Sequence, residues 1–234
     1  MSDKGSIDSD RIAPSAKADR VVLVPYDPAW PERFAEIERE LRQLLGTTLS
    51  RIEHIGSTAV PGLPAKPIID VLAEVPDQEV ARTVAVPALL AAGYYECYWQ
   101  FDLPPGHFTC VKRDTHTYHR LVHLHLAPAG HPQWRSLAFR DYLRSHPGEA
   151  RRYQDLKKDL AVRFAEDREG YTVAKTDYIR ETTERALGLA LARGSGATAQ
   201  FLLGDPELEM LPVAIETRVD DGADSPNGGG REET

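Results

Sequence analysis

The chain has 234 residues, of which 41% are hydrophobic and 27% are charged, a composition that is ordinary for a globular protein. Its formal net charge of -8 argues against broad binding to nucleic acids or anionic membranes, although a local basic pocket is compatible with it. No run approaches the roughly 18 apolar residues of a membrane span, and the N-terminus lacks the apolar segment of a signal peptide. We therefore expect a cytoplasmic protein with no membrane partner, and we do not expect nucleic acid as a partner.

The first part of the chain predicts a tail, a strand and a helix. Residues 1–20 are polar and show no periodicity, so we expect them to be flexible. "VVLVPY", from Val21, predicts a short strand. Asp27 then suits the N-cap of a helix, with Pro28 in its first position, and the apolar spacing that follows runs to Gly46.

The middle of the chain alternates between strand and helix patterns. "SRIEHIG" and "KPIIDVLAEV" predict strands on either side of a proline-rich loop, and Asp77 begins a helical stretch that Pro87 must break or kink and Gly93 closes. Three further strand-like runs follow, "YYECYWQF", "HFTCVKRD" and "YHRLVHLHLAP". The turn-rich "DTHT" between the last two predicts a hairpin.

After Gly130 the pattern is helical through Arg193, with breaks at "SHPGE" and "DREGY". The predicted fold class is therefore α/β (or α+β), a mixed sheet with flanking helices and a C-terminal helical segment. The predicted folded domain is 21–193. Residues 194–219 are expected to form a linker and a possible docking segment, and 220–234 a disordered tail.

The two cysteines, Cys97 and Cys110, lie in apolar strand-like surroundings. With no targeting signal that points outside the cell, they are expected to be reduced thiols in the core.

The stretch "HIGSTAVPGLPAKPIIDVL" is unusual because it is mostly small, rigid and apolar, yet brings a serine, a lysine and an aspartate close together. Gly56 allows the backbone to approach a ligand, Ser57 offers a hydroxyl donor, and Lys66 supplies a charge suited to phosphate. The stretch is therefore interpreted as a phosphate-binding loop. The alternative is a crossover stiffened by prolines, with a solvated lysine.

Asp70 stands in the apolar strand after this loop. Alternation places it between Ile69 and Val71, which point to the other face, so its carboxylate would be desolvated unless it pairs or binds a metal. A metal ligand is the functional interpretation. An arginine or a backbone donor as its partner is the structural one.

Period-two alternation in "YHRLVHLHL" places His119, His123 and His125 on one face of a strand. Histidines two residues apart can reach one metal ion or one phosphate, but they also occur as surface residues of an edge strand. The other histidines considered are expected to be solvated because they lie in or beside turns: His107, His116, His131 and His146.

Several of these segments together resemble the GrpB family. They are "VPYDPAWPERFAEIERELRQLLG", "IEHIGSTAVPGLPAKPIIDVLAEV", the strand pair that ends in "HLHL", and "FRDYLRSHPGEARRYQDLKKDLA". The resemblance covers roughly Val21 to Leu189, and its Gly-Ser-Thr-Ala-Val-Pro-Gly-Leu run is quite specific. It implies the fold of the nucleotidyltransferase superfamily, and some relatives are fused to dephospho-CoA kinase, although no kinase P-loop is present here.

The resemblance also implies roles for single residues. Gly56 and Ser57 match the phosphate-binding turn of the superfamily, and Asp70 falls where active members place an Asp-x-Asp pair that holds magnesium. This chain departs from that pattern, because Ile68 and Leu72 stand two residues away and only one carboxylate of the pair is present. A magnesium site would then need Glu53, Glu74 or a histidine to complete it.

Three functions follow as expectations. The first is nucleotidyl transfer from a nucleoside triphosphate, ATP by expectation, with Gly56, Ser57 and Lys66 on the phosphates. In this scheme Asp70 holds Mg²⁺ or Mn²⁺, and His123 and His125 orient the acceptor or complete the metal shell.

The second is a non-catalytic module that binds a nucleotide or coenzyme A. The third is a metal hydrolase that uses Asp70 and the two histidines, for which zinc or manganese would be preferred. The basic run "EARRYQDLKKDL" is interpreted as a solvated helix face, because acidic residues are interspersed in it.

Overall fold

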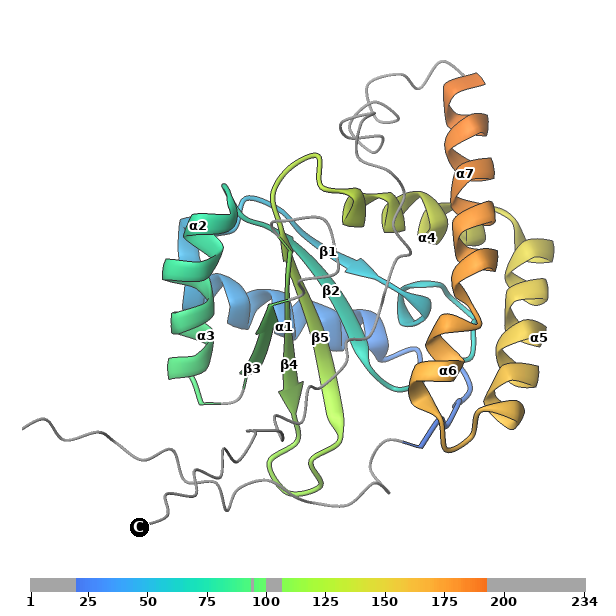
Figure 1. Ribbon diagram of the computed structural model, residues 1–234, viewed down its shortest axis with the longest axis horizontal. Helices are drawn as coiled ribbons and strands as arrows, with labels where there is room; N and C mark the ends of the chain where they lie inside the picture. The colour runs from blue at the N-terminus through green and yellow to red at the C-terminus, as the bar shows by residue number, and fades with distance from the viewer. Residues whose placement is uncertain (1–19, 94, 100–106, 193–234) are drawn as a thin grey trace, which may run out of the picture.

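The computed structural model describes residues 20–93, 95–99 and 107–192 (Figure 1). The predictions for residues 1–20, 194–219 and 220–234 fall outside these ranges, apart from Arg20. Among the described helices, none combines the length and apolarity that a membrane crossing would require.

Helices occupy both ends of the described chain and flank one sheet. The longer α-helices are α1 (Trp30–Leu45), α4 (Ser136–Ser145), α5 (Pro147–Arg163) and α7 (Thr176–Ala192). The shorter ones are α2 (Gln78–Val80), α3 (Val86–Ala91) and α6 (Arg168–Val173). Short turns of helix complete the set: η3 (Gly46–Thr48), η4 (Ser57–Ala59), η5 (Ala81–Ala85) and η6 (Pro132–Arg135).

The five strands form one mixed sheet in the order β1-β2-β5-β4-β3. Their bounds are β1 (Ile52–Ile55), β2 (Ile69–Glu74), β3 (Tyr95–Trp99), β4 (Phe108–Arg113) and β5 (Arg120–Ala127). β2 and β5 are parallel neighbours, while the other three pairs are antiparallel. The predicted α/β class, the hairpin of β4 and β5 and the breaks between the C-terminal helices are confirmed.

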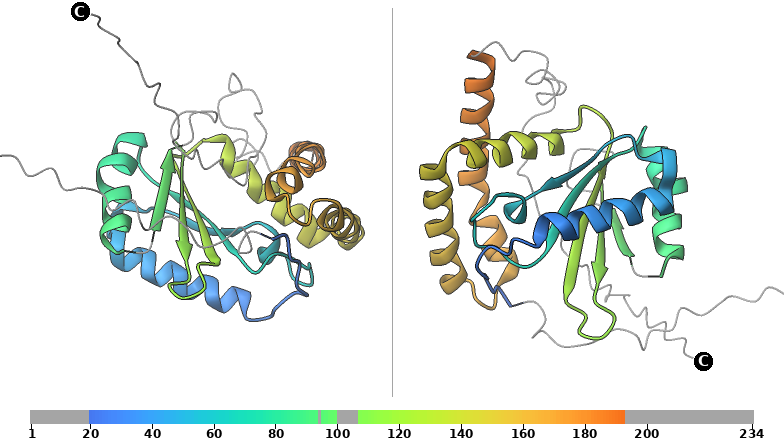
Figure 2. Two further views of the ribbon diagram at one scale, coloured as in Figure 1. Left: turned by 60° about the horizontal axis from the view of Figure 1, so that its bottom comes forward. Right: turned by 180° about the vertical axis from the view of Figure 1, so that it is seen from behind.

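The two faces of the sheet are covered by different helices (Figures 1 and 2). The largest hydrophobic core joins α1 and α3 to one face, which we call the apolar face, through Trp30, Leu41 and Leu89 against Val71 and Leu124. The opposite face, which we call the polar face, packs against η6, α4 and α7. The helices α5 and α6 extend this second layer beyond the edge strand β1 (Figure 2).

Local chemistry explains most of the boundaries. The Asp27 side chain accepts a hydrogen bond from the Ala29 backbone at 2.9 Å, so helix α1 begins two residues later than the sequence predicts. Gly46 ends it with a positive φ of 53°. The π-helical turn η5 stands directly before Pro87, which has no N–H to continue an α-helical pattern. "VVLVPY" forms only an isolated bridge, between Val24 and Ala65.

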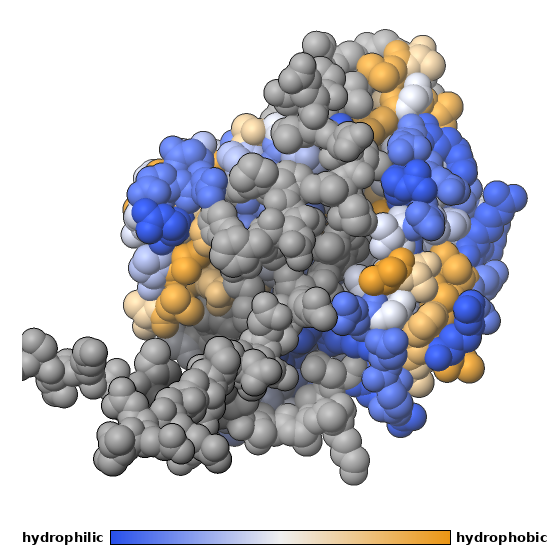
Figure 3. Space-filling model, in the orientation of Figure 1, coloured by the Kyte–Doolittle hydropathy of each residue, from blue (hydrophilic) through white to orange (hydrophobic). Residues whose placement is uncertain are grey.

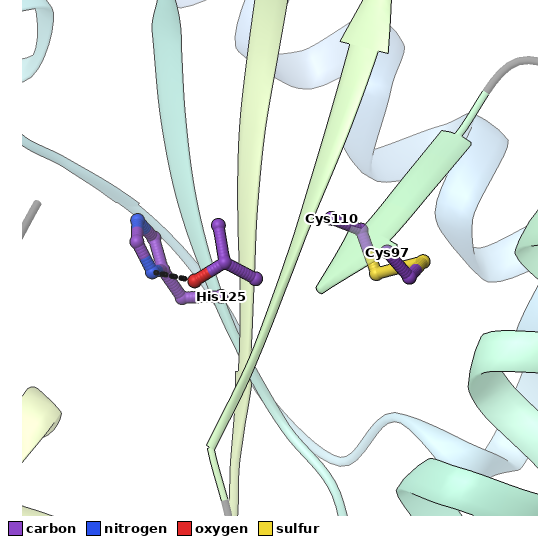
Figure 4. The surroundings of a disulfide bond; sticks show 4 residues. Cys97, Cys110 and His125 are labelled. Carbon is purple, nitrogen blue, oxygen red and sulfur yellow. Dashed lines mark hydrogen bonds between the residues drawn. A yellow bond between two sulfur atoms is a disulfide. The ribbon is translucent and has the colours of Figure 1, made fainter. Parts of the chain in front are cut away.

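The prediction of two reduced thiols is wrong in this structure, since Cys97 and Cys110 form a disulfide and no described cysteine is free. The antiparallel register of β3 and β4 places the two residues directly opposite each other. Only the strand pairing reveals this, because the sequence prediction used the cellular compartment and not the register. Figure 4 shows the disulfide on one side of the sheet and His125 on the other.

Candidate functional site

The Gly56–Ser57 turn joins strand β1 to the helical turn η4. Gly56 has a φ of 71°, and a β-carbon there would collide with the Asp70 carboxylate, so two independent reasons require glycine. Thr58 anchors the turn, because its hydroxyl donates to the Ile68 carbonyl at 3.3 Å and hydrogen-bonds to His54 Nε2 at 3.0 Å. The turn therefore holds Ser57 in a fixed position beside Asp70.

Asp70 pairs with His123 from the neighbouring parallel strand. The register places the two residues opposite each other, and His123 Nδ1 donates to Asp70 Oδ1 at 3.0 Å. Burial raises the pKa of Asp70, but the hydrogen bond from His123 and the proximity of His123, His125 and Lys66 outweigh it and hold the pKa below its ordinary value. The carboxylate is therefore ionised at neutral pH, and its partner is a histidine.

Neither glutamate that the sequence offers as a second metal ligand is available for that role. Glu53 forms ion pairs with Arg140 and Arg51, both at 2.8 Å, and Glu74 accepts from the Ser50 hydroxyl at 2.7 Å. Within the described residues, no group of three His, Cys, Asp or Glu side chains is arranged to hold a metal ion. Among the residues that the structure describes, Asp70 is therefore the only acidic one that lines this site.

Lys157 is a site residue that the sequence interpretation missed. It belongs to the basic run of α5, but it is only 2% exposed, and its Nζ lies 3.1 Å from Ser57 Oγ and contacts the Pro64 carbonyl. Burial, followed by the nearby Lys175, lowers its pKa to about 7. Hydrophilic side chains dominate the outer surface of α5 (Figure 3). The interpretation as a solvated face is therefore correct for exposed neighbours such as Lys158 and wrong for Lys157.

Tyr153 and two more lysines complete the basic side of the site. Tyr153 is buried one helical turn before Lys157, on the same face of α5, and lines the same cavity as Ser57. Burial raises its pKa, so it stays protonated. Lys66 and Lys175 lie 5.5 and 4.0 Å from the centroid of the Tyr171 ring, which brings both ammonium groups to one place.

These groups surround one cavity between the polar face and the C-terminal helices. Its polar lining comprises Gly56, Ser57, Thr58, Lys66, Asp70, His123, Gln133, Ser136, Tyr153, Lys157, Tyr171, Lys175 and Thr183. Five of the six residues that the sequence singles out, Gly56, Ser57, Lys66, Asp70 and His123, are therefore brought together, whereas His125 does not line the cavity. Their chemical roles stay predictions.

His125 lies in a separate cluster of buried imidazoles. Its Nδ1 is 3.0 Å from His107 Nε2 and 3.4 Å from the Thr109 hydroxyl (Figure 4), and burial lowers its pKa to about 4. The His107 ring stacks on both His125 and His131, at 5.2 and 5.4 Å. The expectation that His107 and His131 are solvated is wrong, since they are 1% and 7% exposed. Both flank strands that lie inside the sheet, so their side chains pack over the polar face.

Comparison with known proteins places the chain among relatives. A family model described as GrpB protein matches residues 20–185. The chain is 38% identical over 216 residues to a UPF0157 protein from Pseudomonas aeruginosa, an alignment that covers 92% of this chain and 86% of the relative.

Two further comparisons add a solved structure and a longer protein. The crystal structure of conserved protein GrpB from Enterococcus faecalis matches with a TM-score of 0.65 and 34% identity, and covers 73% of this chain and 99% of that one. A dephospho-CoA kinase from Mycobacterium tuberculosis is 35% identical over an alignment of 185 residues, and the alignment covers 70% of this chain but only 45% of the kinase.

Proposed function

Since this chain belongs to the GrpB family, we propose that it binds a nucleotide whose phosphate groups occupy the cavity beside the Gly56–Ser57 turn. The observation that carries the proposal is the convergence of Lys66, Lys157 and Lys175 on the cavity that Ser57 lines. Each lysine comes from a different segment of the chain, so the convergence is a property of the fold and not of one basic run.

The charge of the cavity favours an anion. Among the described residues that line it, Lys66 and Lys175 are basic, Lys157 adds an N–H donor whose pKa burial lowers to about 7, and Asp70 is the only acid. A protein with a formal net charge of -8 thus places positive charge at this one site. Lysine ammonium groups act as point charges toward phosphate, and their effect is larger where water is excluded.

The size of the cavity suits the phosphate part of the ligand. Water could occupy ≈ 60 Å³ of it, whereas sites that enclose a whole drug-sized ligand measure about 300–1,000 Å³. We therefore place only phosphate groups inside, with the sugar and the base outside the lysine cluster.

Nucleotidyl transfer is a second candidate, favoured by the position of Asp70 against the glycine of the turn. A divalent cation, Mg²⁺ or Mn²⁺, would take one protein carboxylate there and draw its remaining ligands from water and the nucleotide phosphates. When bound, such an ion would neutralise charge on the phosphates. His123 would act by fixing the Asp70 carboxylate, since its Nδ1–H is already directed at Oδ1. The metal-hydrolase alternative stays a prediction.

Calorimetric titration tests both candidates. The ligands are ATP, coenzyme A and dephospho-coenzyme A, the last because of the name of the mycobacterial relatives, each with and without Mg²⁺. Lys66→Ala should weaken binding about tenfold, which corresponds to ~1.4 kcal/mol. Lys158→Ala, which changes an exposed lysine of α5, should not weaken it.

The titrations with and without Mg²⁺ distinguish nucleotide binding from nucleotidyl transfer. If Asp70 holds the ion, Asp70→Asn should abolish the tightening of nucleotide binding by Mg²⁺ while it leaves magnesium-free binding intact. Equal affinity in all four combinations of variant and magnesium would contradict the transfer candidate. No binding of any of the three ligands would contradict the binding proposal.

A further inference from the structure

Ser57, Lys157 and Tyr153 meet inside the cavity in an arrangement that phosphate binding does not require. Lys157 Nζ lies 3.1 Å from Ser57 Oγ, and the buried Tyr153 lines the same cavity. Ser57 lines the cavity and is only partly buried, whereas Lys157 and Tyr153 are each 2% exposed. A reachable hydroxyl is thus held by an amine that is shielded from water.

We propose that Ser57 is a nucleophile with Lys157 as its general base, and that this pair hydrolyses small carboxylic esters. Nucleophilic serines are activated by an adjacent base within about 2.6–3.2 Å, and lysine serves as that base in known variants of the serine triad. This inference does not depend on nucleotide binding, since it concerns the hydroxyl and the amine and not the charge of the cavity.

The surroundings of Lys157 favour the neutral form of its amine, and a general base must be in that form. The side chain is buried on α5, and its second contact is the Pro64 carbonyl, which accepts an N–H from a neutral amine as well as from an ammonium group. The lone pair is then free to accept the proton of the Ser57 hydroxyl. The pKa of about 7, lowered by burial and by Lys175, agrees with this state.

The turn that carries Ser57 also suits a nucleophile. β1 ends at Ile55, Gly56 reverses the chain with a φ of 71°, and Ser57 begins a helical turn. A sharp passage from a strand to a helical turn presents the serine hydroxyl of other hydrolases at the mouth of a site. Tyr153 is a positioning residue here, because its ring centroid lies 4.9 Å from Lys157 Nζ and it acts on the substrate only through that amine.

The reaction balances without a metal or a cofactor. Ser57 Oγ attacks the ester carbonyl carbon, and its proton passes to Lys157 Nζ. The C–O bond to the alcohol breaks, the alcohol leaves with the proton from Lys157, and an acyl-serine remains. Water then attacks the acyl group and gives a proton to Lys157, which returns it to Ser57 Oγ as the carboxylic acid leaves.

Labelling with a fluorophosphonate tests the nucleophile. The reagent forms a P–O bond to an activated serine and loses fluoride, so peptide mass spectrometry should find one adduct, on Ser57. Ser136 lines the same cavity, but its hydroxyl has no hydrogen-bond partner among the described groups, so it should stay unlabelled. No adduct on Ser57 in the folded wild-type protein would overturn the proposal.

Variants test the base. Lys157→Met should slow both labelling and the hydrolysis of p-nitrophenyl acetate by about 100-fold, while Lys158→Met, an exposed neighbour on the same helix, should match the wild type. Tyr153→Phe should slow labelling less. Circular dichroism and a cooperative melt show that each variant is folded. Equal rates in folded Lys157→Met and wild type would overturn the role of Lys157.

The pH profile gives a readout that a structural role would not move. The wild-type labelling rate should rise as the pH passes about 7 and then level off, because only neutral Lys157 accepts the proton. Other titratable groups line the cavity and shift this profile: Lys66, Asp70, His123, Tyr153, Tyr171 and Lys175. The inflection must therefore disappear in Lys157→Met and persist in Lys66→Ala, and an inflection that persists in both would contradict the assignment.

Discussion

The two faces of the sheet differ sharply although the same strands make both. In β5, Leu124 is completely buried in the main hydrophobic core on the apolar face, while His123 and His125 on either side of it belong to the polar face. In β2, Asp70 alternates with Ile69 and Val71 in the same way. Stability and chemistry are thus separated by a single residue step along each strand, because side chains alternate with period two.

A substitution on the apolar face should produce the largest loss of stability and leave the cavity intact. Leu124→Ala removes a fully buried side chain, so we expect the free energy of unfolding to fall by about 2–5 kcal/mol. Urea denaturation measures this change. The nucleotide affinity of the folded variant should equal that of the wild type, and a selective loss of affinity would show that the two faces are coupled.

Reduction of the disulfide should also lower the stability and leave the cavity intact. The bond lies on the apolar side and joins residues 13 positions apart, for which a loss of about 3 kcal/mol is expected when it is broken. Urea denaturation with and without dithiothreitol measures the difference. The double variant Cys97→Ser/Cys110→Ser is the control, since reductant should leave it unchanged. Two titratable thiols in denatured, unreduced protein would restore the original expectation of free cysteines.

Gly56→Ala should lower both the stability and the ligand affinity, because the turn belongs to the polar face. Gly62 has a similar positive φ, 79°, but open space around it, so Gly62→Ala should lose only the backbone term of about 1–2 kcal/mol. Gly56→Ala should lose more, since its methyl group collides with the Asp70 carboxylate, and it should also weaken ligand binding. Equal unfolding free energies for the two variants would show that the collision is relieved without cost.

The last effect is a pH dependence of stability that belongs to Lys157. Its pKa is lowered on folding from the ordinary 10.5 to about 7, so the unfolded chain binds more protons between these values. Stability should therefore rise with pH across that window, by up to about 1.4 kcal/mol for each pH unit, because the penalty for burying the lysine is full at pH 7 and below and vanishes as the pH approaches 10.5. Urea denaturation of wild type and Lys157→Met at pH 7.5 and 9.5 measures this change. An equal change of unfolding free energy with pH in the two proteins would contradict a lowered pKa of Lys157 in the folded state.

Periodicity was sufficient to predict the elements that carry the site. The spacing of Ile37, Leu41 and Leu45 predicts α1, and the alternation in β2 and β5 assigns Asp70 and His123 each to one face of its own strand. Local chemistry acts over a few residues, so it can be read from the sequence. The partner of Asp70 could not be named, because nothing local states that β2 and β5 are neighbours.

The burial of Lys157 could have been predicted from the sequence. Tyr153, Lys157 and Leu160 are spaced four and three residues apart, and all are at most 2% exposed, so the lysine stands in the buried stripe of its helix. The net polarity of the run concealed this spacing. The disulfide and the burial of His107 required the sheet order itself, which pattern alone does not supply.

The residue pairs of the site differ in their separation along the chain, and this difference determines which part of the site can open by local unfolding. Asp70 and His123 are 53 residues apart and are fixed by neighbouring strands, whereas Ser57 and Lys157 are 100 residues apart and meet only when α5 docks. Helix α5 packs outside the sheet, so it can open in a sub-global fluctuation while the strands stay protected. Hydrogen exchange would then report two protection levels within one site. Release of α5 would remove the amine from the hydroxyl and leave the carboxylate–imidazole pair in place.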